Sequence, residues 1–404
     1  MAATLDTLTI VLAIAAFWGA IYVIGKVAKP ERKGFSIKPF YLVYRSQRVD
    51  GILGRLARPE KFWKLFANVS VILGVIFMVA AFSYLVSNLY SFFFAPQSFS
   101  EVTVLLPFVT IRNTEVLTYF FLSLPIILIV HEGGHGVIAK LEKIKVKSGG
   151  FAIIAALFAG FVEPDEEDFN KAKSISRLRV LGAGSGANIM CAVIVSALLI
   201  TTPTFAFVLD SLPGLSAAKP LFYEDSLGVP IFDLIPDGGA GKAGLKPNDI
   251  ITSVKGVTIK TPIDFNKVSL AVGESIEVVV LRNGQLLTRS LLTGPSPVNA
   301  SRGAIGITHS GQPYYPPRIS LGFQMPREVA SFLFWLFFLS FNIAIFNMLP
   351  FYPLDGDGFL NALISAKVPE NRRKLVRTSI NTVALGLLIA NMVATFIKSG
   401  FITI

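Results

Sequence analysis

The chain carries the stretch Val130-His131-Glu132-Gly133-Gly134-His135 inside an apolar segment, residues 116–141, that is long enough to span a membrane. Ionisable side chains are costly in hydrocarbon, so their presence there indicates a function. On a helix, His131 and His135 lie one turn apart on one face, where both can bind a single zinc ion. Glu132 lies beside them as a candidate general base. Two structural core histidines are the alternative, which the accompanying carboxylate disfavours.

The composition indicates a membrane protein. Hydrophobic residues make up 52% of the 404 positions, charged residues make up 16%, and the mean hydropathy is +0.61. A soluble domain of this length could not remain in solution with that balance. Apolar segments that are long enough for a bilayer core occur at residues 8–27, 66–90, 116–141, 180–202, 329–349 and 380–397. We therefore expect a polytopic α-helical membrane protein with about six transmembrane helices in a lipid bilayer.

The basic residues predict the orientation of these segments. The net charge of +11 does not indicate nucleic acid as a partner, because the basic residues lie in short loops beside apolar segments. By the positive-inside rule, the loop between the first two segments is cytoplasmic and the N-terminus is outside. The basic residues of that loop are Lys38, Arg45, Arg48, Arg55, Arg58, Lys61 and Lys64. The expected location is the cell membrane, and Cys191, the single cysteine, allows no intramolecular disulfide.

One soluble domain is expected at residues 222–295, on the extracytoplasmic side. A turn rich in Gly and Pro at residues 243–249 leads into a strand and turn at 251–256. A helical stretch at 264–272 and strands at 275–281 and 286–292 follow. This pattern resembles a PDZ domain of the protease-associated kind, in which Leu227-Gly228-Val229 matches the carboxylate-binding loop. The resemblance implies binding of a peptide C-terminus. The alternative is a small β domain that only spaces two helices.

A second polar cluster follows the fifth apolar segment, at Asn347-Met348-Leu349-Pro350-Phe351-Tyr352-Pro353-Leu354-Asp355-Gly356-Asp357-Gly358. A catalytic zinc site needs three protein ligands and an open position, and the histidine pair supplies two ligands. The third and fifth segments both run from outside to inside. They bring His131 and Asp355 to the same cytoplasmic end, so Asp355 is the predicted third ligand.

Together these motifs resemble the site-2 protease family of intramembrane zinc metalloproteases. The resemblance rests on the histidine motif, the run from Asn347 to Gly356, the inserted PDZ-like domain and Asn188 in a glycine-rich segment. It implies zinc on His131, His135 and Asp355, with Glu132 as the catalytic acid/base. It also implies substrates that are transmembrane segments of other membrane proteins, cut near the cytoplasmic face. The PDZ-like domain would screen these substrates.

The chain departs from the family's usual pattern in three places, one of which is that both variable positions of the histidine motif are glycine, Gly133 and Gly134. Ser185 replaces a proline, which makes the placement of Asn188 less constrained. Asp357 replaces a small residue and could be a hydrogen-bond acceptor behind the ligands, a competing ligand or a solvated carboxylate. We favour the solvated carboxylate, because helix ends near water often carry Asp. Asn188 is the favoured amide for assisting the oxyanion, and Asn347 is the other candidate. Ordinary interhelical hydrogen bonding is the alternative role for both.

Residues 148–162 are apolar but too short to span the membrane twice, and both flanking segments end in the cytoplasm. A re-entrant hairpin fits this stretch. We expect its edge to pair with an extended substrate, and a buried plug is the alternative. His309 is expected to be an exposed loop histidine.

The predicted organisation has four parts. An N-terminal helix and basic loop occupy residues 1–63, helices with the zinc motif 64–205, the PDZ-like domain 222–295 and the last helices 328–404. Two other functions stay open. One is a catalytically silent PDZ-bearing scaffold, which the complete histidine motif disfavours. The other is a membrane-anchored peptidase of soluble proteins, which the lack of a sizeable cytosolic domain disfavours.

Overall fold

A computed structural model gives the structure of the chain. It describes residues 7–28, 34–155, 157–203, 205–211, 215–297, 299–309, 311–319, 322, 325–400 and 402. The chain divides into two compact units. Unit 1 comprises Met1–Val195 and Ser331–Ile404, and unit 2 comprises Ser196–Ala330.

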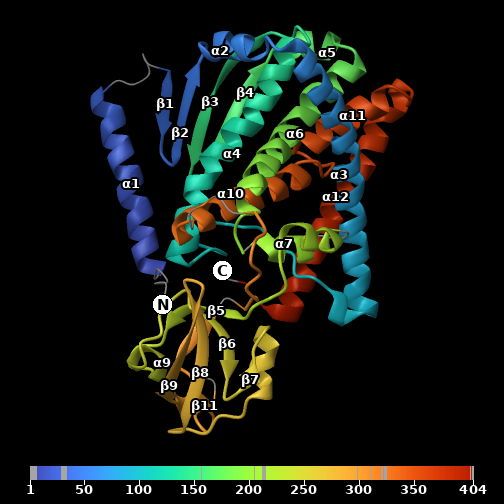
Figure 1. Cartoon of the computed structure of the whole chain (residues 1–404). Helices are drawn as coiled ribbons and strands as arrows, with labels where there is room; N and C mark the ends of the chain where they lie inside the picture. The colour runs from blue at the N-terminus through green and yellow to red at the C-terminus, as the bar shows by residue number, and fades with distance from the viewer. Residues whose placement is uncertain are drawn as a thin grey trace. The chain divides into compact units, whose positions relative to one another are not determined.

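Unit 1 is built mainly from long helices (Figure 1). They are α1 (Thr7–Ala28), α2 (Val49–Leu56), α3 (Glu60–Phe94), α4 (Thr114–Leu141), α5 (Glu166–Lys171), α6 (Ser174–Leu199), α10 (Arg327–Phe346), α11 (Asp355–Ser365) and α12 (Glu370–Ser399), with the short 3-10 helix η2 (Pro96–Ser98). Within the described residues, α3, α4, α6, α10 and α12 are long and apolar enough to cross a membrane. The first predicted segment coincides with α1, whose described apolar stretch is the shorter Ala15–Gly25. A total of six spans therefore stays a prediction.

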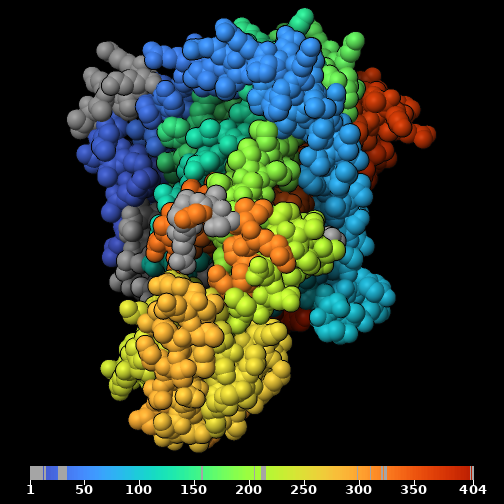
Figure 2. All heavy atoms as spheres, viewed as in Figure 1, coloured from blue at the N-terminus to red at the C-terminus, as the bar shows by residue number. Residues whose placement is uncertain are grey.

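Helix α3 is an example of a long helix with an exposed apolar face. It is 35 residues long and exposes apolar side chains along its length, among them Leu65, Ile72 and Val79. In the space-filling view its light-blue side chains form a continuous column on the surface (Figure 2). An exposed apolar face of this length is suited to lipid contact.

A four-stranded antiparallel sheet lies beside the helices of unit 1 (Figure 1). Its strands are β1 (Phe35–Lys38), β2 (Tyr41–Ser46), β3 (Val146–Ile154) and β4 (Leu157–Pro164), in that order. The predicted hairpin at residues 148–162 is therefore the β3–β4 hairpin, with Ala156 outside the described residues. Strand β4 is one of the two edge strands of this sheet, with β3 as its neighbour. Entry of this hairpin into the membrane stays a prediction.

Helix α4 carries the histidine motif and packs closely on α6. It begins at Thr114, because the Asn113 side chain accepts hydrogen bonds from the Glu115 and Val116 backbone N–H groups and so caps the first turn. A Cβ atom at Gly134 would lie 2.6 Å from the carbonyl oxygen of Ala183 on α6. Glycine thus allows the two helix backbones to approach, as small residues do in membrane proteins.

Unit 2 contains a sheet with the strand order β12-β5-β6-β8-β9, with β7 paired to β6. Its elements are α7 (Phe205–Ser211), η3 (Ser216–Ala218), α8 (Lys219–Phe222), β5 (Val229–Leu234), α9 (Gly239–Lys242), β6 (Ile250–Val254), β7 (Val257–Thr258), η4 (Pro262–Lys267), β8 (Ser275–Arg282), β9 (Gln285–Leu292), β10 (Gly294–Pro295), β11 (Gly303–Ala304) and β12 (Ile307–His309). Branched and aliphatic side chains from β5, β6, β8 and β9 form its core, including Val229, Ile251, Val278 and Leu291. Unit 2 therefore has a hydrophobic core of its own.

Three details of unit 2 differ from the sequence predictions. The helix expected at 264–272 is the shorter 3-10 helix η4, in which the Asp264 side chain helps to cap the first turn. His309 is exposed but lies in β12, where its ring stacks on Phe265 with centroids 5.6 Å apart. The loop assigned to peptide binding is paired within the chain. The Leu227 N–H donates to the Tyr314 carbonyl (3.1 Å), and the Tyr314 N–H donates to the Gly228 carbonyl (2.8 Å). That loop therefore does not offer the Leu227 amide to a peptide end.

Candidate metal centre

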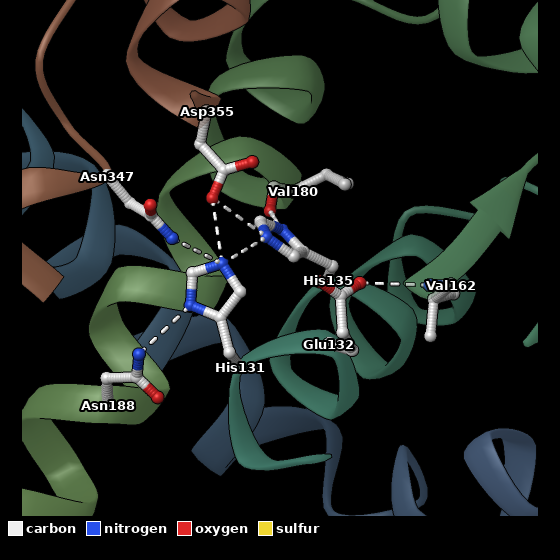
Figure 3. A network of polar contacts seen from close by, with 8 residues as sticks. All are labelled: His131, Glu132, His135, Val162, Val180, Asn188, Asn347 and Asp355. Atoms are coloured by element: carbon white, nitrogen blue, oxygen red, sulfur yellow. Dashed lines mark hydrogen bonds and ion pairs between the residues drawn. The ribbon is translucent and has the colours of Figure 1, made fainter. Parts of the chain in front are cut away.

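The side chains of His131 and His135 meet that of Asp355, which lies more than 200 positions later in the sequence, in unit 1 (Figure 3). The Asp355 Oδ2 atom lies 2.9 Å from His131 Nε2 and 3.1 Å from His135 Nε2, and the two Nε2 atoms are 3.2 Å apart. Ligands of a tetrahedral zinc ion with bonds of about 2.0–2.1 Å are separated by about 3.3 Å. These three atoms therefore fit three corners of one zinc tetrahedron. Among the described residues, this is the group of His, Cys, Asp and Glu side chains that could hold a metal ion.

The far nitrogen of each imidazole has a polar partner. The His135 Nδ1 atom lies 2.7 Å from the Val180 carbonyl oxygen, which can only accept, so this nitrogen carries the proton. The His131 Nδ1 atom lies 3.1 Å from the Nδ2 atom of Asn188, whose side chain is fully buried. The Oδ1 atom of Asn188 is buried without a hydrogen-bond partner. A half-turn of the amide group exchanges the two atoms, so that Oδ1 accepts the His131 Nδ1 proton and both Nε2 lone pairs are free for a metal. Partners of this kind orient metal-binding histidines in known sites.

Helix α6 passes directly beside the three candidate ligands at Gly184. A Cβ atom at this position would lie 2.3 Å from His135 Nε2 and 2.7 Å from His131 Nε2. Any larger residue at this position would therefore collide with the candidate ligand atoms. Gly184 belongs to the glycine-rich segment that contributed to the sequence resemblance.

We expect the substitution Gly184→Ala to weaken zinc binding by at least about tenfold, because its methyl group displaces both imidazoles from the shared centre. Competition with a chelator of known affinity measures the effect on the purified protein. Gly133→Ala is the matched control, since a Cβ atom there meets no neighbouring atom within 4 Å. Equal zinc affinities for the two variants would contradict the expectation.

Glu132, the candidate acid/base, is held from the neighbouring sheet. Its Oε2 atom accepts a hydrogen bond from the Val162 backbone N–H of β4 at 2.9 Å (Figure 3). A Cβ atom at Gly160 would lie 3.1 Å from the Glu132 Cγ atom, so β4 passes close to this side chain. The edge strand of the sheet and the motif helix therefore meet at the candidate acid/base.

The two candidate amides take different places around His131. Asn188 contacts Nδ1, the ring nitrogen on the far side from Asp355. The Asn347 Nδ2 atom lies 3.2 Å from Nε2, on the side of the candidate ligands. The two amides thus reach one imidazole of α4, Asn188 from α6 and Asn347 from the turn after α10.

The start of α11 is held against the turn that follows α10. The Gly356 N–H donates to the Asn347 carbonyl at 2.8 Å. A Cβ atom on Gly356 would lie 2.3 Å from the Leu349 carbonyl oxygen, so this position requires glycine. This close approach brings Asp355 to the histidines of α4.

Asp357 is not the solvated carboxylate that we favoured from the sequence. Its residue is 4% exposed, and its carboxylate pairs with Arg377 and Asn381 of α12. The hydrogen bond from Arg377, together with the weaker effect of Asn381, holds the pKa of Asp357 below its usual range, although burial of the side chain raises it. Its oxygens are engaged at α12, which also disfavours a competing ligand. The partner Arg377 lies 20 positions later, and the sequence alone carried no signal that the two side chains face each other.

The region that holds these residues matches a known family. A model described as peptidase family M50 matches residues 119–390, which is more than half of the chain and includes the histidine motif and Asp355. The chain belongs to peptidase family M50. Membership confirms the resemblance to site-2 proteases. With its long apolar helices, this M50 peptidase is a multi-pass membrane protein.

Two curated relatives are similar to this M50 peptidase over much of its length. An uncharacterized protein of Methanocaldococcus jannaschii is 28% identical over 244 residues, which cover 60% of this chain and 56% of that protein. This M50 peptidase thus spans little more than half of that relative. A protein named "Putative zinc metalloprotease" from Clostridium perfringens is 24% identical over 349 residues, covering 69% of this chain and 97% of the relative.

A solved structure is similar to part of this M50 peptidase. It is the crystal structure of the PDZ domain of an SdrC-like protein from Listeria monocytogenes. The identity is 20%, the match covers 21% of this chain and 88% of that domain, and the TM-score is 0.19. We draw no argument from a TM-score this low, so a PDZ-like role for unit 2 stays a proposal.

Proposed function

We propose that this M50 peptidase hydrolyses peptide bonds within transmembrane segments of other membrane proteins, near the cytoplasmic face of the cell membrane. The observation that carries the proposal is the meeting of His131, His135 and Asp355 within a unit of long apolar helices. Ionisable groups held inside such helices are expensive and are retained for function. A site among these helices is within reach of substrates that lie in the same bilayer.

Zinc is the proposed cofactor, with His131, His135 and Asp355 as its ligands and one position left for the reaction. When bound there, zinc would lower the pKa of a water molecule and polarise the scissile carbonyl. Glu132 takes a proton from the attacking water and passes it to the leaving amine. Glu132 directly follows the candidate ligand His131 in the sequence, which supports this role.

The two amides support the reaction in different ways. Contact with His131 Nδ1 supports a positioning role for Asn188, which keeps the imidazole oriented and its tautomer fixed. Asn347 lies on the ligand side of the same ring, where its Nδ2 group can donate to a developing oxyanion. We therefore move the oxyanion role from Asn188, which the sequence favoured, to Asn347.

Strand β4 is the proposed binding edge for the substrate. A peptide bond in a transmembrane helix is shielded by its own turn, so cleavage requires the segment to unwind. An outermost strand can hold an unwound segment extended by backbone hydrogen bonds. Along β4, the Val162 N–H already points away from β3 to Glu132, and alternation places the Gly160 N–H on the same side.

The shared N–H group links substrate pairing to Glu132. A substrate carbonyl that pairs with the Val162 N–H takes the donor that now holds Glu132 Oε2. Pairing at this position therefore releases the carboxylate next to the bond to be cut. Glu132 thus loses its hydrogen bond to Val162, and can take part in the reaction, when an extended substrate is bound along β4.

Unit 2 is the proposed substrate filter. The positive-inside rule, applied to the basic loops, supports an extracytoplasmic location for it. It has its own core and so can act as a separate PDZ-like module that controls which segments reach the site. Because Leu227 and Gly228 are paired with Tyr314, this role does not use the loop expected from the sequence.

We expect a single-span substrate with a cysteine near its cut site to form a disulfide with an Ala159→Cys variant, prepared in a Cys191→Ser background. Ala159 lies on β4, whose outer edge is next to Glu132. Ser36→Cys is the matched control, because Ser36 lies on β1 at the opposite end of the sheet. Detergent-purified protein and mass spectrometry locate both the cut and the cross-link. A cut outside the transmembrane segment would contradict the proposed function, and a cross-link from β1 alone would contradict the role of β4.

A further inference from the structure

We infer that Asp357 is a positioning residue, which with Arg377 and Asn381 fixes the first turn of α11 so that Asp355 faces the two histidines. The inference rests on the proposed function, because it takes Asp355 to be a metal ligand. It assigns a role to Asp357, which the sequence favoured as a solvated carboxylate.

The first turn of α11 needs support from side chains. The helix begins at Asp355, and Leu354 before it makes no side-chain cap. Its first backbone contacts run to the preceding turn, from the Gly356 N–H to Asn347 and from the Asp357 N–H to Leu354. These contacts hold the start of the helix in place, and its buried side chains, among them Phe359 and Leu360, pack in the core. The polar contact of Asp357 adds a restraint on how the first turn is rotated about the helix axis.

The two carboxylates of this turn point to different helices. Residues two positions apart on an α-helix are about 200° apart around its axis. Asp355 accordingly reaches the histidines of α4, and Asp357 reaches α12. Arg377 Nε donates to Asp357 Oδ1 at 2.7 Å, Asn381 Nδ2 donates to the same oxygen at 2.7 Å, and a second Arg377 nitrogen donates to Oδ2.

This contact resists rotation of the helix. A guanidinium and a carboxylate joined by two parallel hydrogen bonds have a defined relative orientation. Rotation of α11 that turned Asp355 away from the histidines would also break the pair behind it. The carboxylate of Asp357 and the guanidinium of Arg377 therefore help to set the direction in which Asp355 points.

The contact between Asp357 and Arg377 lies at a cavity, so a substitution there should not disrupt the fold. Asp357, Arg377 and Asn381 border a cavity of about 540 Å³ whose other lining side chains are mostly polar, including Lys374 and Thr378. A shorter polar side chain at position 377 would be in contact with water in this cavity. Arg377→Gln is therefore expected to fold.

The test measures zinc affinity by chelator competition for full-length, detergent-purified wild type, Asp357→Asn, Arg377→Gln and the double variant. Each single change is expected to weaken zinc binding about 10- to 100-fold, which is the usual effect of losing a group that orients a metal ligand. The double variant is expected to bind no more weakly than the worse single variant, because both changes remove the same contact. The visible bands of the Co²⁺-substituted single variants should shift, since the carboxylate ligand is no longer held in one orientation.

Glu142→Gln is the matched control. It breaks the ion pair between Glu142 and Arg179, 2.8 Å apart, at the end of α4. A purely structural loss of this kind lowers thermal stability and leaves zinc affinity within about twofold. Wild-type affinity and unchanged Co²⁺ bands in Asp357→Asn, or additive losses in the double variant, would overturn the inference alone. Wild type without zinc, or His131→Ala with wild-type affinity, would overturn the proposed function as well.

Discussion

The variant Glu132→Gln should bind zinc like the wild type and cleave its substrate about 10²- to 10⁴-fold more slowly. Glutamine keeps the size of the side chain, and its carbonyl oxygen can still accept the Val162 N–H that now binds Glu132. The fold around the site is therefore preserved. The amide group cannot take up a proton from water at neutral pH, so the acid/base step is lost.

Cleavage rate and zinc content, measured on the same preparations, test this expectation. Glu163→Gln is the matched control, because Glu163 is an exposed carboxylate on the same strand, β4, hydrogen-bonded to Ser148 at 2.7 Å. It should cleave at nearly the wild-type rate. Equal cleavage rates for wild type and Glu132→Gln would show that Glu132 is not the catalytic acid/base.

The variant Asp355→Ala should lose both zinc and activity. The carboxylate oxygen that lies about 3 Å from both Nε2 atoms disappears, which leaves two protein ligands where a catalytic zinc site has three. Loss of a direct ligand should weaken zinc binding more than about 100-fold, beyond the effect of groups behind the ligands. Chelator competition and metal analysis after dialysis measure this loss.

Asp50→Ala controls for the removal of an aspartate from unit 1. Asp50 forms an ion pair of 2.8 Å with Lys140 near the end of α4, and no candidate metal ligand takes part in it. This variant should keep its zinc. If Asp355→Ala retained zinc with wild-type affinity, Asp355 would not be a ligand and the centre would need a different third donor.

Sequence reasoning could place the candidate ligands because it combined two independent regularities. Helical spacing alone puts His131 and His135 on one face of α4. The alternation of spans across the membrane then brings Asp355 to the same end, and the structure places these three side chains together. Helical spacing and the alternation of membrane spans can both be read from the sequence without knowing how side chains pack.

The features that the sequence did not predict depend on pairing between distant segments. Strands β1 and β2 lie within the basic loop, where the charges indicated a cytoplasmic connection but not its partner, β3. Asp357 looked like a carboxylate at a helix end, and its burial follows only from where Arg377 of α12 lies. The Leu227 loop matched a family pattern, but its backbone is occupied by Tyr314. In each case the deciding partner is set by the tertiary fold.

The sequence separation within the candidate metal centre has a consequence for how the protein is made. His131 and Asp355 are 224 positions apart, and Arg377 follows Asp355 later still. A chain that is still being synthesised has its histidines in place long before the carboxylate emerges from the ribosome. We therefore expect peptidase activity to arise only after the last helices have been inserted, which protects neighbouring nascent membrane proteins from premature cleavage.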